Sequence, residues 1–103
     1  MENILSKITF LIEKYESGEW QSVETLRLML RELSSNYYFL TKHNIEYFNA
    51  HNAVQYKHKG SVSAGLILAN EQVPELRLTR KILYSTSKVL DSMRSELSII
   101  KND

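Results

Sequence analysis

The fold is decided by residues 22–58, which read SVETLRLMLRELSSNYYFLTKHNIEYFNAHNAVQYKH. Mostly apolar and aromatic side chains recur here with alternating spacings of three and four, and no glycine or proline interrupts them. This repeat is a heptad seam, typical of a long helix that packs along another helix. The seam consists of Val23, Leu26, Leu30, Leu33, Tyr37, Leu40, Asn44, Tyr47, His51 and Val54. We therefore predict a helix over residues 21–58 with Ser22 as its N-cap.

A second seam with the same spacing lies towards the C-terminus. Its members are Leu76, Thr79, Leu83, Thr86, Leu90, Met93, Leu97 and Ile100. The pattern predicts a helix over residues 70–101, capped by Asn70 and with Pro74 in its first turn, where a missing N–H does no harm. The alternative is a continuous helix kinked at Pro74, because the heptad phase extends backwards through Ala69 and Gly65 to Val62.

Two shorter segments complete the layout. Amphipathic spacing predicts a first helix over residues 3–16, which Gly18 ends because glycine adopts the left-handed conformation without strain. The small residues of 60–65 predict either a hairpin bend or a place where two helices approach closely. With only three glycines and one proline in 103 residues, the chain is expected to be a single all-α domain, 1–103.

The expected architecture is a short helix beside two long antiparallel helices in a coiled-coil-like hairpin. The core seam is expected to include Leu26, Leu30, Leu33, Tyr37, Leu40, Leu76, Leu83, Leu90 and Leu97. A helix over 21–58 would be about 57 Å long, whereas a compact domain of this size has a radius of gyration near 13 Å. A weaker apolar stripe through Tyr38, Ile45 and Phe48 would also stay uncovered. We therefore predict a homo-oligomeric bundle.

Two polar residues on the first seam, Asn44 and His51, have two interpretations. A polar residue at a seam position can fix helix register and oligomer state. The other interpretation is that this end of the seam is simply exposed to solvent.

Several classes of function find no support in the sequence. The absence of cysteine excludes disulfides and thiolate chemistry, and no apolar run approaches the roughly 20 residues of a membrane span. His43, His51 and His58 are spaced by eight and seven residues, too far apart on a helix to share one metal ion. The carboxylates of the first helix form a solvated face. We expect a soluble, cytoplasmic protein without catalytic residues, metal or cofactor, and with no membrane partner.

Charge is distributed unevenly, although the net charge is only +1. Residues 1–24 contain five carboxylates and two cations, whereas residues 27–59 contain five cations and two carboxylates, and residues 76–101 contain six cations and two carboxylates. In an antiparallel hairpin, a basic and aromatic group at the end of the first long helix would face a basic group at the start of the last. The two groups are Tyr56, Lys57 and Lys59, and Arg77, Arg80 and Lys81. Cations neutralise phosphates and aromatic rings stack on bases, so this grouping predicts a site for single-stranded DNA or RNA.

The layout also resembles a known family. A short acidic helix is followed by a heptad helix with tyrosine and histidine, a small-residue bend, the segment Val73-Pro74-Glu75-Leu76-Arg77, and a leucine-spaced basic helix ending Met93-Arg94-Ser95-Glu96-Leu97. This order over residues 21–101 is similar to small phage-encoded helical accessory proteins, including recombination mediators of the UvsY type. The resemblance implies helical hairpins that oligomerise and bind single-stranded DNA while assisting a recombinase.

A second function is compatible with the same pattern. A near-zero net charge with a surplus of apolar stripe is also typical of a protein–protein adaptor, or of a phage-type inhibitor of a host protein, acting through its helical faces. As an alternative to a nucleic-acid site, scattered lysines are also typical of an ordinary solvated face, and helically spaced tyrosines are also typical of a core. The sequence therefore predicts a non-enzymatic binding or scaffolding module whose partners are a second copy of itself and either a nucleic acid or a protein.

Overall fold

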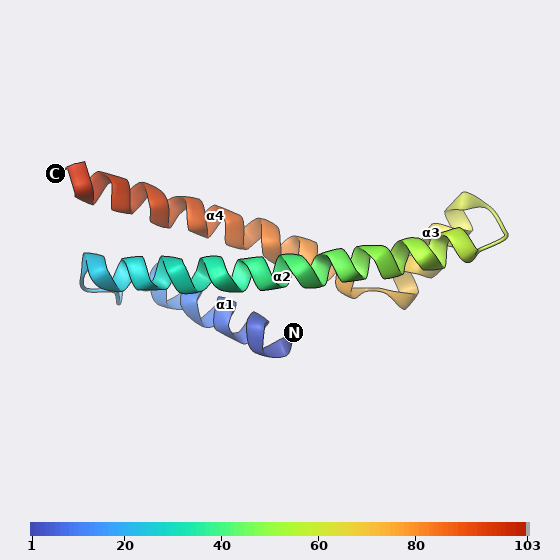
Figure 1. Ribbon diagram of the computed structural model, residues 1–103, viewed down its shortest axis with the longest axis horizontal. Coiled ribbons are helices and arrows are strands. Elements are labelled where there is room, and N and C mark those ends of the chain that lie inside the picture. The colour runs from blue at the N-terminus through green and yellow to red at the C-terminus, as the bar shows by residue number, and fades with distance from the viewer. Residues whose placement is uncertain (103) are drawn as a thin grey trace.

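The computed structural model describes the backbone of residues 1–102 and the side chains of residues 1–100. Four helices make up this part of the chain: α1 (Glu2–Glu16), α2 (Val23–Lys57), α3 (Val62–Gln72) and α4 (Glu75–Asn102). The long helices α2 and α4 run antiparallel side by side, and α1 lies along one half of the pair (Figure 1). The molecule is elongated, with extents of 61 × 25 × 19 Å and a radius of gyration of 17.7 Å. The prediction of an all-α fold around two long helices is confirmed.

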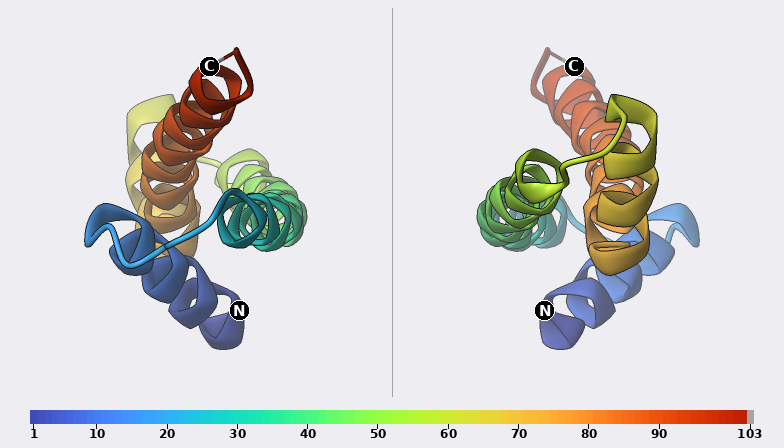
Figure 2. Two further views of the ribbon diagram at one scale, coloured as in Figure 1. Left: turned by 90° about the vertical axis from the view of Figure 1, so that its left-hand side faces the viewer. Right: turned by 90° about the vertical axis from the view of Figure 1, so that its right-hand side faces the viewer.

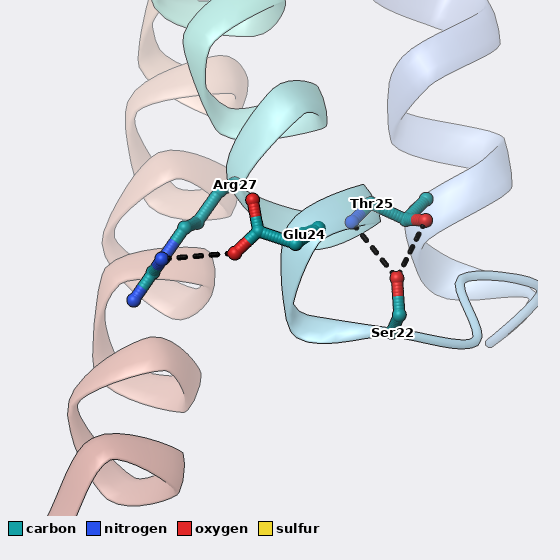
Figure 3. Close-up of polar contacts among 4 residues, drawn as sticks. All are labelled: Ser22, Glu24, Thr25 and Arg27. Atoms are coloured by element: carbon teal, nitrogen blue, oxygen red, sulfur yellow. Dashed lines mark hydrogen bonds and ion pairs between the residues drawn. The ribbon is translucent and has the colours of Figure 1, made fainter.

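The helix ends follow from local side-chain chemistry. The Ser22 hydroxyl accepts a hydrogen bond from the Thr25 backbone N–H at 3.1 Å, and Arg27 pairs with Glu24 in the first turn of α2 (Figure 3). The cap supplies an acceptor to an N–H that has no partner within the helix. Gly18 follows α1 with a φ of +73°, which a side chain would disfavour. These two features set the short connection between α1 and α2.

The hydrophobic core lies among three helices in one half of the molecule. Viewed along the long axis, α1, α2 and α4 surround a common centre (Figure 2). The buried members of this core are Ile8, Leu11, Leu26, Met29, Leu33, Leu40, Leu90 and Met93. The other predicted seam residues are buried or half-buried: Leu76 is buried, and Leu30, Tyr37, Leu83 and Leu97 are half-buried. Burial of these side chains drives the association of helices that would be marginal alone.

The predicted bend and the start of the last helix need correction. Residues 62–69, predicted as bend and connection, form the helix α3 together with 70–72, and the last helix begins at Glu75 instead of residue 70. Ser61 caps α3 by accepting from the Ala64 N–H, so the turn is confined to the residues just before it. The break falls at Val73, whose φ of −129° and ψ of 66° are non-helical because Pro74 disfavours the helical conformation of the preceding residue. Asn70 therefore lies inside α3 and is not a cap.

Small residues allow α3 to pack closely on α2. Gly65 and Ala69 are buried, and a Cβ on Gly65 would lie only 3.2 Å from the Gln55 carbonyl oxygen. The backward extension of the second seam is thus correct for Ala69 and Gly65, whereas Val62 is 80% exposed. The alternative interpretation of the small-residue stretch, a close helix approach, is confirmed at Gly65.

The two polar seam residues bond to neighbouring helices, Asn44 to α4 and His51 to α3. The Asn44 amide donates to the Thr79 hydroxyl at 2.8 Å, and His51, which is buried, hydrogen-bonds to the Asn70 side-chain oxygen at 2.9 Å. From the first pair to the second, the residue number rises from 44 to 51 on α2 and falls from 79 to 70 on the partner helices. Both bonds therefore fit one antiparallel register. The interpretation that this end of the seam is simply exposed is wrong, because His51 is buried, Asn44 is half-buried, and each has a specific partner.

Candidate functional site

The predicted cationic groups lie in two separate places. Arg80 contacts the ring of Phe48 on α2, nine residues before Lys57, which corresponds to about 14 Å along the helix. Lys57 and Lys59 instead border an open hollow of about 380 Å³ at the far end of α2. The two groups do not face each other at the bend, as the sequence predicted, because α3 occupies the side of α2 in between.

The end of α2 presents the first predicted group. Tyr56 is 84% exposed, and Lys57 and Lys59 lie at the rim of the hollow. The hollow is lined by Ala53, Val54, Lys57, His58, Lys59, Leu68 and Gln72. Lys57 and Lys59 have no adjacent carboxylate, so this end is basic. Among the described residues, Tyr56 is its only tyrosine, phenylalanine or tryptophan.

The start of α4 presents the second group in a richer setting. The guanidinium carbon of Arg80 lies 5.8 Å from the centre of the Phe48 ring, and the Lys88 ammonium lies 4.5 Å from the centre of the Tyr84 ring. On α2, the Lys42 ammonium lies 5.4 Å from the centre of the Tyr38 ring. A cation over an aromatic face is attracted by the negative potential of the ring. We call these six residues, Tyr38, Lys42, Phe48, Arg80, Tyr84 and Lys88, the aromatic–cation face.

Helix geometry places the members of the aromatic–cation face on one side of α2 and α4. Tyr84 follows Arg80 by four residues and Lys88 follows Tyr84 by four, so all three share a side of α4. Tyr38 precedes Phe48 by ten residues, about 2.8 turns, so the two side chains are offset by roughly 80° around the axis of α2. The Arg80–Phe48 contact joins the two helices. The rings remain accessible: Tyr38 is 58% exposed, Phe48 43% and Tyr84 64%.

The α4 part of this face carries only positive charge. Between Leu76 and Leu90, α4 contains Arg77, Arg80, Lys81 and Lys88 and no carboxylate. The ion pairs among the described side chains are Arg27–Glu24, His43–Glu46 and Arg94–Asp91, and none of them involves these four cations. Arg77, Arg80 and Lys81 also border a shallow hollow with Leu78. The charges of the four cations are therefore not neutralised by an ion pair with another described side chain.

The sequence did not reveal Tyr84 and Lys88. A usable signal was present, because a lysine follows a tyrosine by four residues both at Tyr38–Lys42 and at Tyr84–Lys88. On a helix this spacing places the ammonium over the preceding ring. The two pairs became one face only when the register between α2 and α4 was known.

The histidines have individual surroundings. His43 lies 3.7 Å from a Glu46 carboxylate oxygen, His51 bonds to Asn70, and His58 packs against Gly60 and Gly65 at the turn. Among the described residues, no three side chains of His, Cys, Asp or Glu come together as metal ligands would. None of the described helices is long and apolar enough to cross a bilayer. Comparison with protein families, curated proteins and solved structures finds no match to this chain.

Proposed function

We propose that the protein is a non-enzymatic, homo-oligomeric accessory protein that binds single-stranded nucleic acid through the aromatic–cation face. The observation that carries the proposal is the presence of three exposed rings, Tyr38, Phe48 and Tyr84, each with a cation over it, in a region without carboxylates on α4. Cations contact phosphates, and rings offer surfaces on which unpaired bases stack. The resemblance of the sequence to recombination mediators supports a role for this binding in assisting a recombinase.

The geometry favours a single strand over a duplex. Bases in a duplex are stacked on each other and offer only their edges, so exposed aromatic rings gain little from it. The Asn44–Thr79 bond places Tyr38 and Tyr84 at a similar level, because Tyr38 lies six residues before Asn44 and Tyr84 lies five after Thr79 on the antiparallel helix. Phe48 lies about 15 Å from Tyr38 along α2. The rings thus form an extended platform along the helix pair instead of one pocket.

A second function, a protein–protein adaptor or inhibitor, is favoured by a different surface. Phe10 on α1 is 63% exposed, and Leu28 and Phe39 on α2 are 57% and 47% exposed. Glu13, Lys14 and Glu19 border the same hollow as Phe10, so carboxylates outnumber cations there. Exposed apolar side chains beside a slight excess of negative charge suit a protein partner better than a phosphate backbone.

Oligonucleotide binding separates the two functions. We expect a fluorescent oligothymidine to bind at about 50 mM salt, where phosphate contacts are strong, and to bind more tightly than a duplex of the same length. Tyr84→Ala should weaken binding by roughly 5- to 150-fold, which corresponds to the loss of one stacked base at about 1–3 kcal/mol. The matched control is Phe10→Ala, which removes a ring on α1 outside the aromatic–cation face with a similar exposure, 63% against 64% for Tyr84. Absence of binding by an intact oligomer would refute the nucleic-acid function and leave the adaptor.

A further inference from the structure

The helix α3 is unusual in composition for an exposed element. From Val62 to Ala69 it has no charged side chain, and a helix that is apolar all round is normally buried. Only Gly65 and Ala69 are buried against α2. Val62 is 80% exposed, Ile67 60% and Leu66 42%. Three aliphatic side chains of α3 are therefore largely exposed in the monomer.

The part of the molecule that carries these side chains is only two helices thick. We call residues 50–72, the end of α2 together with α3, the arm. In Figure 1, α1 covers the opposite half of α2 and does not extend along the arm. The arm contains the His51–Asn70 bond but none of the core side chains that α1, α2 and α4 share. Two helices alone bury little apolar surface, whereas four can enclose a core.

The charges of the arm are arranged at its two ends. Lys57 and Lys59 lie at the tip, and Glu71, the only carboxylate among residues 50–72, lies towards the base. Glu71 is four residues from Ile67, about 6 Å along α3, and Val62 at the tip is five residues in the other direction, about 7.5 Å. If two arms lie antiparallel about a two-fold axis at Ile67, the Lys59 end of each arm is level with Glu71 of the other.

We propose that a second copy of this chain covers the arm, with α3 against α3 in this antiparallel arrangement, so that two arms form a four-helix bundle. The inference rests on the assembly part of the proposed function and names its surface. A self-complementary two-fold contact matches an apolar centre with opposite charges at its ends. An anionic lipid surface would attract the tip lysines but would not satisfy Glu71, whereas a second copy pairs both.

Light scattering on the full-length protein tests the surface. The wild type is expected to show an oligomer mass at micromolar concentration, and Ile67→Asp is expected to shift it to the 12.0 kDa of one chain or to half of the oligomer mass. The matched control is Ile99→Asp, because Ile99 is 63% exposed and lies on α4 away from the arm. A monomeric wild type would overturn both the assembly and this interface. An oligomer that Ile67→Asp leaves intact would overturn the interface alone.

Charge reversal tests the antiparallel register without touching an apolar side chain. Lys59→Glu and Glu71→Lys should each weaken self-association by roughly tenfold, because each places like charges together twice per dimer. Mixing the two variant proteins should restore association, since both contacts in the mixed dimer are then between opposite charges. A contact within one chain cannot be repaired by mixing. Single variants that dissociate but do not recover on mixing would contradict the proposed register.

Discussion

Leu33 on α2 is fully buried in the core shared by α1, α2 and α4. Leu33→Ala removes buried methyl groups and leaves a cavity, so the free energy of unfolding should fall by about 2–5 kcal/mol. Leu28→Ala is the control, because Leu28 is 57% exposed and its loss should change stability by less than about 0.5 kcal/mol. Urea denaturation measures both. Equal effects of the two substitutions would show that the seam is misplaced.

Thr86 on α4 is also fully buried, but its hydroxyl has no hydrogen-bond partner among the described residues. A buried unpaired hydroxyl is destabilising, so Thr86→Val, which keeps the shape, should raise the free energy of unfolding by about 1 kcal/mol. The contrast is Thr79→Val: the Thr79 hydroxyl donates to the Glu75 carbonyl oxygen and accepts from Asn44, and its loss should destabilise. A destabilised Thr86→Val variant would mean that the hydroxyl has a partner, such as a buried water.

At the scale of elements, the packing of α3 on α2 depends on Gly65. Gly65→Ala favours the helix by up to about 1 kcal/mol in propensity. However, the new Cβ would lie 3.2 Å from the Gln55 carbonyl oxygen and 3.3 Å from the His58 Cβ, so α3 must move away from α2. We expect a net loss of about 1–2 kcal/mol, measured by thermal or urea unfolding. Ser63→Ala, at an exposed position of the same helix, should be neutral or stabilising.

The packing of α1 on α4 should weaken at alkaline pH. Burial, together with the nearby Glu96 carboxylate, raises the pKa of Tyr15 above its ordinary value of 10.0. The folded protein therefore retains the phenolic proton more strongly than the unfolded chain. This stabilisation is complete below pH 10 and is lost as the pH rises through the raised pKa. Above about pH 10, the unfolding free energy of the wild type should fall relative to that of Tyr15→Phe, which has no phenol to ionise. A difference that stays constant up to pH 12 would contradict this coupling.

The elements also show what the sequence could and could not predict. The seams through Leu33 and Leu90 were readable because their spacing alone defines the buried side of a helix. The prediction of a bend missed α3, because Gly65 and its small neighbours resemble a turn and their packing on Gln55 and His58 is a tertiary contact. The alternative, a helix kinked at Pro74 whose heptad phase extends back to Val62, came closer to the structure, in which the helix is interrupted at Val73. The aromatic–cation face was only half visible for the same reason: the sequence contains the tyrosine–lysine spacing but not the register that brings Arg80 to Phe48.

At the scale of the whole molecule, the shape argues for assembly. The radius of gyration of 17.7 Å exceeds the roughly 13 Å expected of a compact chain of this length. If the arm pairs with a second copy, unfolding releases two chains, and the melting temperature should rise with protein concentration. Ile67→Asp should reduce this dependence while keeping a helical circular-dichroism spectrum. A melting temperature independent of concentration in the wild type would contradict assembly.

The central claim, nucleic-acid binding by the aromatic–cation face, is tested most directly by a salt titration of oligothymidine binding. The logarithm of the affinity should fall linearly with the logarithm of the salt concentration, by about 0.7 per phosphate contacted. Arg80→Ala with Lys88→Ala should therefore reduce the slope by about 1.4. Lys57→Ala with Lys59→Ala, at the separate tip, should leave the slope nearly unchanged. No binding at about 50 mM salt with the oligomer intact, or a slope that the Arg80 and Lys88 substitutions do not change, would contradict the claim.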